Sequence, residues 1–457
     1  MASLSLRQAG NPRAFAVNHG VVLRLAVPMT AAYLSVPLVG LVDTAVIGQI
    51  GIAALIGGIA IGAIILDILF TTCNFLRAGT TGLTAQAFGA GDEKEQQAVL
   101  GRALMIALVI GLAIVVLQKP LIATGLWLMH VGPEVEGAAG DYLAVRIWAA
   151  PFVLANFVLV GWLLGVARPG TVLLLQTIFA TLNIGLSLLF VLHLGWGVAG
   201  VAWASVLAEA VIVALTLPFV VPLLPAGSRP SRKRVFDRQG FVRIIAVNRD
   251  IMVRSFSLLF AFAFFTRQGA QFGDVILAAN AVLMHFFLIG GYFLDGLATA
   301  AEQLAGRAVG ARYRPAFRSS VRLTLIWGFA LSLALTAIYL AAGRQFIAFM
   351  TTAPEVRATA QMFLIWAALT PLAGVLAFQM DGIFIGATWS SDMRNMMLVS
   401  LAAYLAALAV LTPALGNHGL WAALLVFLGV RGLSLFLRLR RREPETFGEA
   451  GAPAVSS

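Results

Sequence analysis

The segment AALIGGIAIGAIILDILFTTCNFL, residues Ala53–Leu76, decides the class of fold that this chain can adopt. Its only charged side chain is Asp67, and about 20 apolar residues are enough for a helix to cross the hydrocarbon core of a membrane. Similar segments fill most of the chain. Of the 457 residues, 60% are hydrophobic and 11% are charged, whereas soluble globular chains carry about 25% charged residues. The composition therefore indicates a polytopic membrane protein and leaves no room for a soluble domain.

The apolar segments predict an all-α fold of twelve transmembrane helices. We place them at Val21–Gly48, Ala53–Leu76, Leu100–Met129, Asp141–Gly165, Thr171–Val191, Val198–Pro222, Phe241–Arg267, Val275–Gln303, Val321–Met350, Val356–Gly386, Met393–Thr412 and Gly419–Leu437.

The distribution of charge predicts the orientation of these helices. Lys and Arg gather at both ends of the chain and in every second loop, while the other loops are short, nearly uncharged or acidic. Basic loops stay on the cytoplasmic side of a membrane. The net charge of +11 thus reflects topology and not nucleic-acid binding. We expect a multi-pass protein of the bacterial inner membrane with both termini cytoplasmic.

The two halves of the chain repeat each other at a lag of 220 to 222 residues. Matching pairs recur in order along the sequence: Gln49-Ile50-Gly51 with Gln271-Phe272-Gly273, Gly89 with Gly310, Pro133-Glu134-Val135 with Pro354-Glu355-Val356, Pro151 with Pro371, Gly161 with Gly382, and Gly195 with Gly416. Each half holds six predicted helices, so the repeat is parallel. We expect an N-terminal lobe (1–222), a basic cytoplasmic linker (223–240), a C-terminal lobe (241–437) and a disordered C-terminal tail (438–457). Such duplicated bundles are typical of transporters that work by alternating access.

Asp43 is the first candidate for a functional residue. It lies in the outward half of the first helix, and no basic residue stands within one helical turn of it. Ionisable groups inside a span are costly and are functional candidates by default, and burial favours the neutral form of a carboxyl group. Pro37, which bends the same helix, makes a proton-coupling role for Asp43 more attractive. The alternative is a carboxyl group that caps a helix end near the surface.

Other polar residues within the helices form two sets. In the first half, Glu209 is a second proton-site candidate or a partner for an arginine, and the uncharged residues line a cavity or only bond helices together: Asn156, Asn183, Ser187 and Ser205. In the second half, Asp295 and Asp381 have a transport role or form structural pairs with arginines: Arg249, Arg254 and Arg431.

Several kinds of chemistry lack their sequence signals. The single cysteine, Cys73, and the five scattered histidines give no disulfide framework and no metal-ligand spacing. Neither a nucleotide-binding Walker motif nor a metalloprotease motif is present. We therefore expect no enzyme activity, no cofactor and no metal, with a proton gradient as the source of energy and a monomer as the working unit.

Specific strings along the whole chain resemble the multidrug and toxic compound extrusion (MATE) family, in particular its DNA-damage-inducible F branch. They include VDTAVIG (42–48), TTGLTAQAFGA (80–90), ANAVLM (279–284) and DGIFIGATW (381–389). The resemblance implies twelve helices in two lobes, V-shaped, and export of amphipathic, often cationic, organic compounds in exchange for protons. The expected partners are thus small organic cations or amphipathic drugs, protons and membrane lipids.

The resemblance also assigns residues, and it leaves alternatives open. The family's first-helix carboxylate falls on Asp43, and its fifth-helix pair, an Asn followed four residues later by an Asp, falls on Asn183 and Ser187. Because Ser187 cannot titrate, Asp43 acts alone, Glu209 assists it, or coupling resides in the other lobe. Sodium-coupled relatives carry an acid on the seventh helix that is missing here, although Asp381 matches their acid on the tenth. The rival functions are sodium-coupled efflux, a flippase for a lipid-linked substrate, and a membrane enzyme that acts on lipid.

Overall fold

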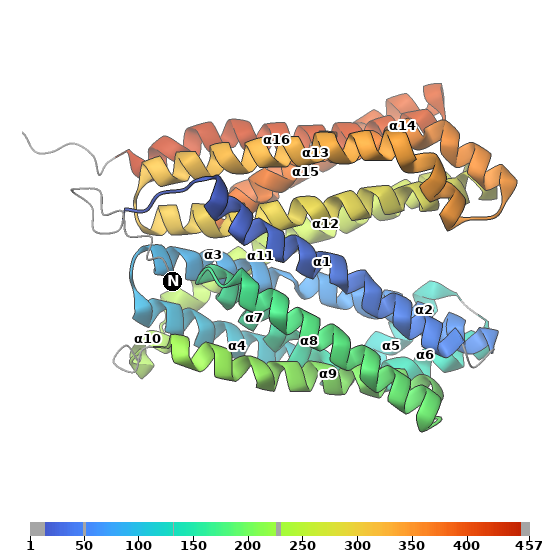
Figure 1. Ribbon diagram of the computed structural model, residues 1–457, viewed down its shortest axis with the longest axis horizontal. Helices are drawn as coiled ribbons and strands as arrows, with labels where there is room; N and C mark the ends of the chain where they lie inside the picture. Colours follow the sequence, from blue (N-terminus) through green and yellow to red (C-terminus); the bar gives the residue numbers. More distant parts are fainter. Residues whose placement is uncertain (1–13, 49–51, 131, 225–229, 449–457) are drawn as a thin grey trace, which may run out of the picture. The chain divides into compact units, whose positions relative to one another are not determined.

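The apolar segments form long helices in the computed structural model of the protein, which describes residues 14–48, 52–130, 132–224 and 230–448 (Figure 1). No strand occurs within these ranges. The helices are α1 (His19–Gly48), α2 (Ala53–Cys73), α3 (Phe75–Gly89), α4 (Glu93–Val116), α5 (Gln118–Met129), α6 (Pro133–Arg146), η1 (Ile147–Ala149), α7 (Ala150–Gly165), α8 (Pro169–Leu188), η2 (Leu189–His193), α9 (Gly197–Val220), η3 (Val221–Leu223), α10 (Arg232–Val235), α11 (Arg238–Ala270), α12 (Asp274–Gly310), α13 (Arg314–Met350), α14 (Pro354–Gly386), α15 (Ser390–Leu415) and α16 (Asn417–Phe447).

All twelve predicted spans coincide with helices. In the described part of the chain, ten helices or helix pairs are long and apolar enough to cross a membrane, and the first and seventh predicted spans are the helices α1 and α11. The predicted all-helical membrane fold is confirmed. Two predicted spans are interrupted by a single residue: Asn74 separates α2 from α3, and Leu117 separates α4 from α5. The fourth span also begins earlier than predicted, at Pro133, a residue suited to the first turn of a helix.

The chain forms two compact units. The first unit holds residues 34–84 and 92–248, and the second holds, of the described residues, 14–33, 85–91 and 249–448. The expected boundaries, 1–222 and 241–437, thus differ from those of the units. Close packing within the second unit explains part of this difference: Gly310 lies against the backbone of Gln86 so tightly that a Cβ would not fit, and the Gln86 side chain donates a hydrogen bond of 3.1 Å to the carbonyl of Gly386.

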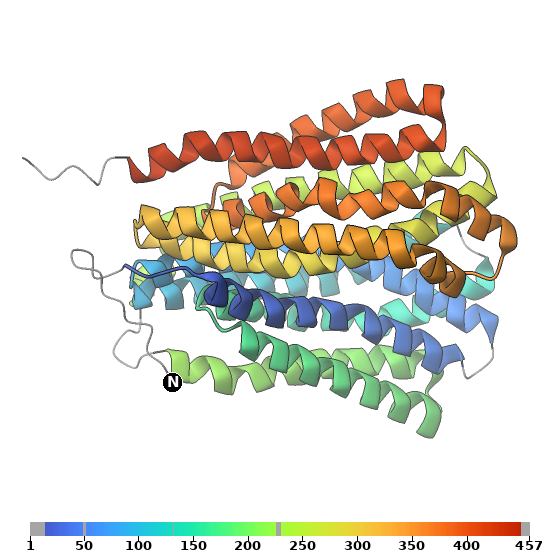
Figure 2. The same ribbon diagram turned by 45° about the horizontal axis from the view of Figure 1, so that its top comes forward.

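Within each unit the helices pack by their apolar faces. In the first unit, α2 packs on α6, α4 on α7, and α9 on both α6 and α8. In the second unit, α14 contacts α12, α13 and α16, and α15 packs on α16; Figure 2 shows these last helices in orange and red. Large apolar side chains fill the core of the second unit, among them Phe265, Phe286, Tyr404, Trp421 and Phe427.

The C-terminal helix is longer than the sequence suggested. α16 continues to Phe447, so the prediction of a disordered tail from residue 438 is wrong for residues 438–447. Ion pairs hold this extension: Arg438 and Arg442 contact the buried Asp392 at 2.6 and 2.5 Å, and Glu443 contacts Arg314 at 2.8 Å. The remainder of the predicted tail, 449–457, lies outside the described residues, as do Gln49, Ile50 and Gly51 of the first repeat match.

The basic linker packs on α4 through a buried arginine and through the ion pairs of Arg234 with Asp92 and Glu95, at 2.5 and 3.2 Å. Arg102 of α4 donates hydrogen bonds to the carbonyl oxygens of Arg234 (2.8 Å) and Val235 (3.2 Å) in α10, and it pairs with Glu95 at 2.8 Å. Its side chain is only 3% exposed. The part of the predicted linker at 225–229 lies outside the described residues.

Candidate functional site

Asp43 of α1 faces α8 in the first unit. The hydroxyl group of Ser187 donates a hydrogen bond of 2.8 Å to a carboxylate oxygen of Asp43, and both residues are buried. A π-turn, η2, follows one residue after Ser187; such turns occur frequently at functional sites. A hydroxyl group can donate to a carboxylate and accept from a carboxylic acid, so Ser187 can serve Asp43 in either protonation state.

One helical turn before Ser187, Asn183 extends the polar surface of α8 toward α9. Its side-chain nitrogen donates a hydrogen bond of 2.9 Å to the hydroxyl oxygen of Ser205. The amide oxygen of Asn183 is buried and has no hydrogen-bond partner among the described residues. Since buried acceptors are normally satisfied, this oxygen is available to a bound cation or a water molecule.

Glu209 lies on α9, one turn after Ser205, and is 6% exposed. The side chain of Asn156, on α7, is within hydrogen-bonding reach of its carboxylate. The second carboxylate oxygen of Glu209 is buried and accepts no hydrogen bond from the described residues. The predicted first-half set therefore comes together on four helices, α1, α7, α8 and α9.

The sequence analysis missed the charged residue that links these acids. Arg146, at the C-terminal end of α6, interacts electrostatically with Asp43, Asp67 and Glu209, and it forms a hydrogen bond with Tyr142. Its presence inside a predicted span was the available signal, because a guanidinium group within a membrane seeks a carboxylate partner.

The charges at this site do not balance. Two buried carboxylates, those of Asp43 and Glu209, and the exposed carboxylate of Asp67 interact electrostatically with one guanidinium, that of Arg146. Full ionisation of the two buried acids and Arg146 would leave a formal charge of −1. Buried charges require partners. A bound proton or another cation would neutralise this excess charge.

The two second-half candidates lie in a different setting. Asp381 of α14 accepts a hydrogen bond of 2.8 Å from Arg254 and another from Arg431, which is 4% exposed. Asp295 of α12 is half-buried. Arg249, the third expected partner, instead pairs with Asp250 at 3.2 Å. The structure thus pairs Asp381 with two of the three expected arginines, the buried Arg431 and the half-buried Arg254.

Comparison with known proteins identifies the family. The sequence model of the MatE family matches the chain twice, at residues 28–189 and 251–411. The chain belongs to the MATE family. The double match agrees with the internal repeat, and the predicted family is confirmed.

Individual relatives and solved structures agree with this assignment. The chain is 40% identical over 427 residues to DNA damage-inducible protein F of Escherichia coli, with 91% of each chain covered. It is 24% identical to multidrug resistance protein MdtK of Edwardsiella ictaluri, covering 93% of this chain and 96% of that protein. A MATE crystal structure in the bent conformation matches with a TM-score of 0.86 at 19% identity, over 94% of this chain and 97% of that one. The chain is thus a multi-pass MATE transporter.

Proposed function

We propose that this transporter exports amphipathic, mainly cationic organic compounds in exchange for protons, and that Asp43 and Glu209 carry the exchange. The observation that supports the proposal is the charge imbalance around Arg146. A site with this excess negative charge can hold a proton in one state and an organic cation in another. Exchange then follows when the two ions compete for the same carboxylates during alternating access.

Ser187 explains how such a mechanism can work without the second carboxylate expected on the fifth helix. Its hydroxyl group keeps Asp43 hydrogen-bonded at 2.8 Å and carries no charge of its own. Glu209, which also interacts with Arg146, supplies an acid from α9 instead. We infer that the second acid of the mechanism lies on α9, at Glu209, and not on α8, where Ser187 stands.

Sodium is the second candidate for the coupling ion. Oxygen ligands suit hard cations, and the unpartnered amide oxygen of Asn183 lies one turn from Ser187, the partner of Asp43. The bacterial inner membrane, with both chain termini cytoplasmic, is the proposed location for either mechanism, since the basic segments lie at the termini and in the linker.

The test is ethidium transport by the full-length protein in proteoliposomes, driven by a pH gradient without sodium or by a sodium gradient without a pH gradient. We expect transport to follow the pH gradient and to be lost in Asp43→Asn. Asp141→Asn, the same substitution at an exposed position of α6, is the matched control and should transport normally. Transport that follows only the sodium gradient would show that sodium, and not the proton, is the coupling ion. No transport under either gradient would favour the alternative function, a flippase for a lipid-linked substrate.

A further inference from the structure

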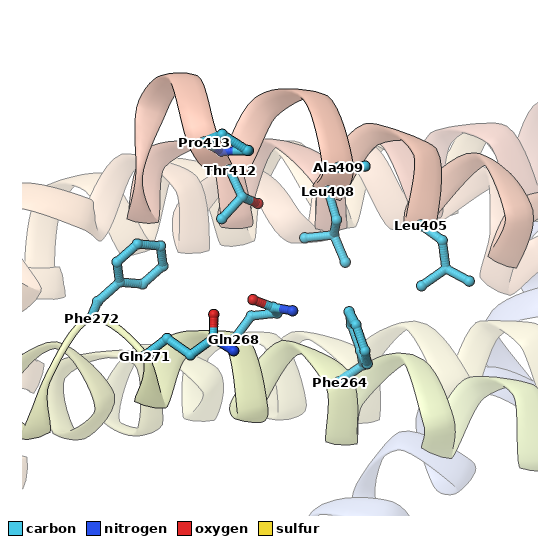
Figure 3. A pocket seen from close by; sticks show the side chains of 9 residues that line it. All are labelled: Phe264, Gln268, Gln271, Phe272, Leu405, Leu408, Ala409, Thr412 and Pro413. Atoms are coloured by element: carbon cyan, nitrogen blue, oxygen red, sulfur yellow. The ribbon is translucent and has the colours of Figure 1, made fainter.

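The second unit contains a cavity of about 460 Å³ between the C-terminal parts of α11 and α15 (Figure 3). Small-molecule sites typically enclose about 300–1,000 Å³. The residues that line it come from these two helices and from the turn that follows α11: Phe264, Gln268, Gln271, Phe272, Leu405, Leu408, Ala409, Thr412 and Pro413.

The lining is aromatic and amide-rich. The side chains of Gln268, on α11, and Gln271, in the turn after it, extend toward α15, and Phe264 and Phe272 flank them. Across the cavity, the hydroxyl oxygen of Thr412 is buried and has no hydrogen-bond partner in the described part of the chain. An unsatisfied buried hydroxyl group costs free energy, which a bound ligand with a polar group would recover.

The cavity is not suited to a cation. None of its lining side chains, as far as the structure describes them, is charged. The guanidinium carbon of Arg267 lies 6.0 Å from the ring centroid of Phe264, so this ring already has a positive charge near it. A ligand with its own positive charge would be repelled by Arg267, whereas an uncharged aromatic ring can stack on the phenyl groups.

The internal repeat gives this cavity a counterpart in the first unit. Phe264 stands 221 residues after Asp43, and Leu408 stands 221 residues after Ser187, which is the lag of the repeat. The cavity therefore occupies, in the second unit, the place where the first unit has the hydrogen bond between Asp43 and Ser187. In this repeat the acid and its hydroxyl partner are replaced by a phenyl ring and an isobutyl group.

We propose that the cavity between α11 and α15 binds uncharged aromatic compounds that carry hydrogen-bonding groups. This inference rests on the proposed export of organic compounds and widens its substrate class. The rings of Phe264 and Phe272 contact the aromatic part of the ligand, and Gln268, Gln271 and Thr412 bond its polar groups.

The test measures equilibrium binding to the full-length protein in lipid nanodiscs. Tritiated chloramphenicol, an uncharged aromatic compound with amide and hydroxyl groups, is compared with the cation ethidium. Ala409→Trp fills the cavity, and Val410→Trp, at a neighbouring position that is 69% exposed and does not line it, is the control. We expect Ala409→Trp to weaken chloramphenicol binding by about tenfold or more, Thr412→Val to weaken it several-fold, and ethidium binding to stay within about twofold in both.

The outcomes separate this inference from the proposed function. Equal chloramphenicol binding by Ala409→Trp and Val410→Trp, or no saturable binding by the wild type because a lipid chain fills the cavity, overturns the inference. Equal loss of chloramphenicol and ethidium in Ala409→Trp also overturns it, because the cavity would then not select uncharged ligands. The proposed function is judged separately, by whether wild-type ethidium transport follows the pH gradient and depends on Asp43.

Discussion

A buried network of amide side chains in the second unit predicts how two substitutions change the stability of the protein. Asn280 of α12 and Asn417 of α16 exchange two hydrogen bonds, of 2.7 and 2.9 Å, and the indole nitrogen of Trp421 donates a third, of 2.9 Å, to Asn280. All three side chains are buried. Substitution of Asn280 by Leu, a residue of similar size, removes the three bonds and leaves Asn417 and Trp421 without their partner.

The expected loss of stability follows from the number of bonds. Side-chain hydrogen bonds between membrane helices contribute about 0.6 kcal/mol on average and at most about 1.7 kcal/mol. Three of them give a loss of about 2–5 kcal/mol for Asn280→Leu. For a unit of this size, 1 kcal/mol corresponds to about 2–4 °C in the melting temperature, so we expect a decrease of about 4–20 °C.

A second substitution should restore part of this stability. In the double variant Asn280→Leu/Asn417→Leu, the amide group of Asn417 is no longer left unsatisfied, and only the indole nitrogen of Trp421 lacks its partner. Replacing both partners of a buried hydrogen bond by apolar groups can be nearly neutral. We therefore expect the double variant to melt at a higher temperature than Asn280→Leu alone.

The assay is thermal unfolding of the purified protein in detergent, followed by tryptophan fluorescence. The buried Trp421 lies in the network itself and packs edge-on against Phe265, at 5.0 Å between ring centroids. Asn395→Leu, at an exposed position of α15, serves as the control and should shift the melting temperature little. A double variant that melts below Asn280→Leu would refute the reasoning, because the two losses would then simply add.

Three further predictions concern packing and charge. Gly386→Ala should lower the free energy of unfolding by about 1–3 kcal/mol or more, because a Cβ at this position would meet the backbone of Glu302. Gly429→Ala, where a Cβ would meet no neighbouring group within 4 Å, should leave the stability unchanged. Size-exclusion chromatography after heating distinguishes the two variants. Arg102→Met should loosen the basic linker, which the ion pairs of Arg234 with Asp92 and Glu95 then hold alone, and should increase its rate of tryptic cleavage over that of the wild type, as followed by gel electrophoresis. Asp381→Asn should lower the free energy of unfolding by about 3–5 kcal/mol, measured by denaturant titration, because it removes the negative charge that the buried Arg431 shares with the half-buried Arg254.

The helices were largely predictable from the sequence, while their ends were not. A span is set by the length of its apolar run, which is local information and needs no knowledge of neighbours. The end of α16 depends instead on ion pairs of Arg438 and Arg442 with Asp392, on another helix. Charged residues therefore extended a helix where composition alone suggested a disordered tail.

The candidate site was predictable in its residues and incomplete in its electrostatics. Asn183 and Ser187 are one turn apart, so their shared face could be inferred from helical periodicity. Arg146 was missed because its partners Asp43, Asp67 and Glu209 lie on three other helices, and only tertiary packing brings them to it. Contacts of this kind leave no spacing pattern in the sequence.

The two units have kept the same fold and taken opposite charge. In the first unit the buried carboxylates of Asp43 and Glu209 interact with the single guanidinium of Arg146, and in the second unit Arg254 and Arg431 share the carboxylate of Asp381. A site with excess negative charge can exchange cations. A carboxylate that is already paired with two guanidinium groups has little affinity for a further cation. Cation exchange is thus expected in the first unit, and the cavity of the second unit remains for compounds that carry no charge.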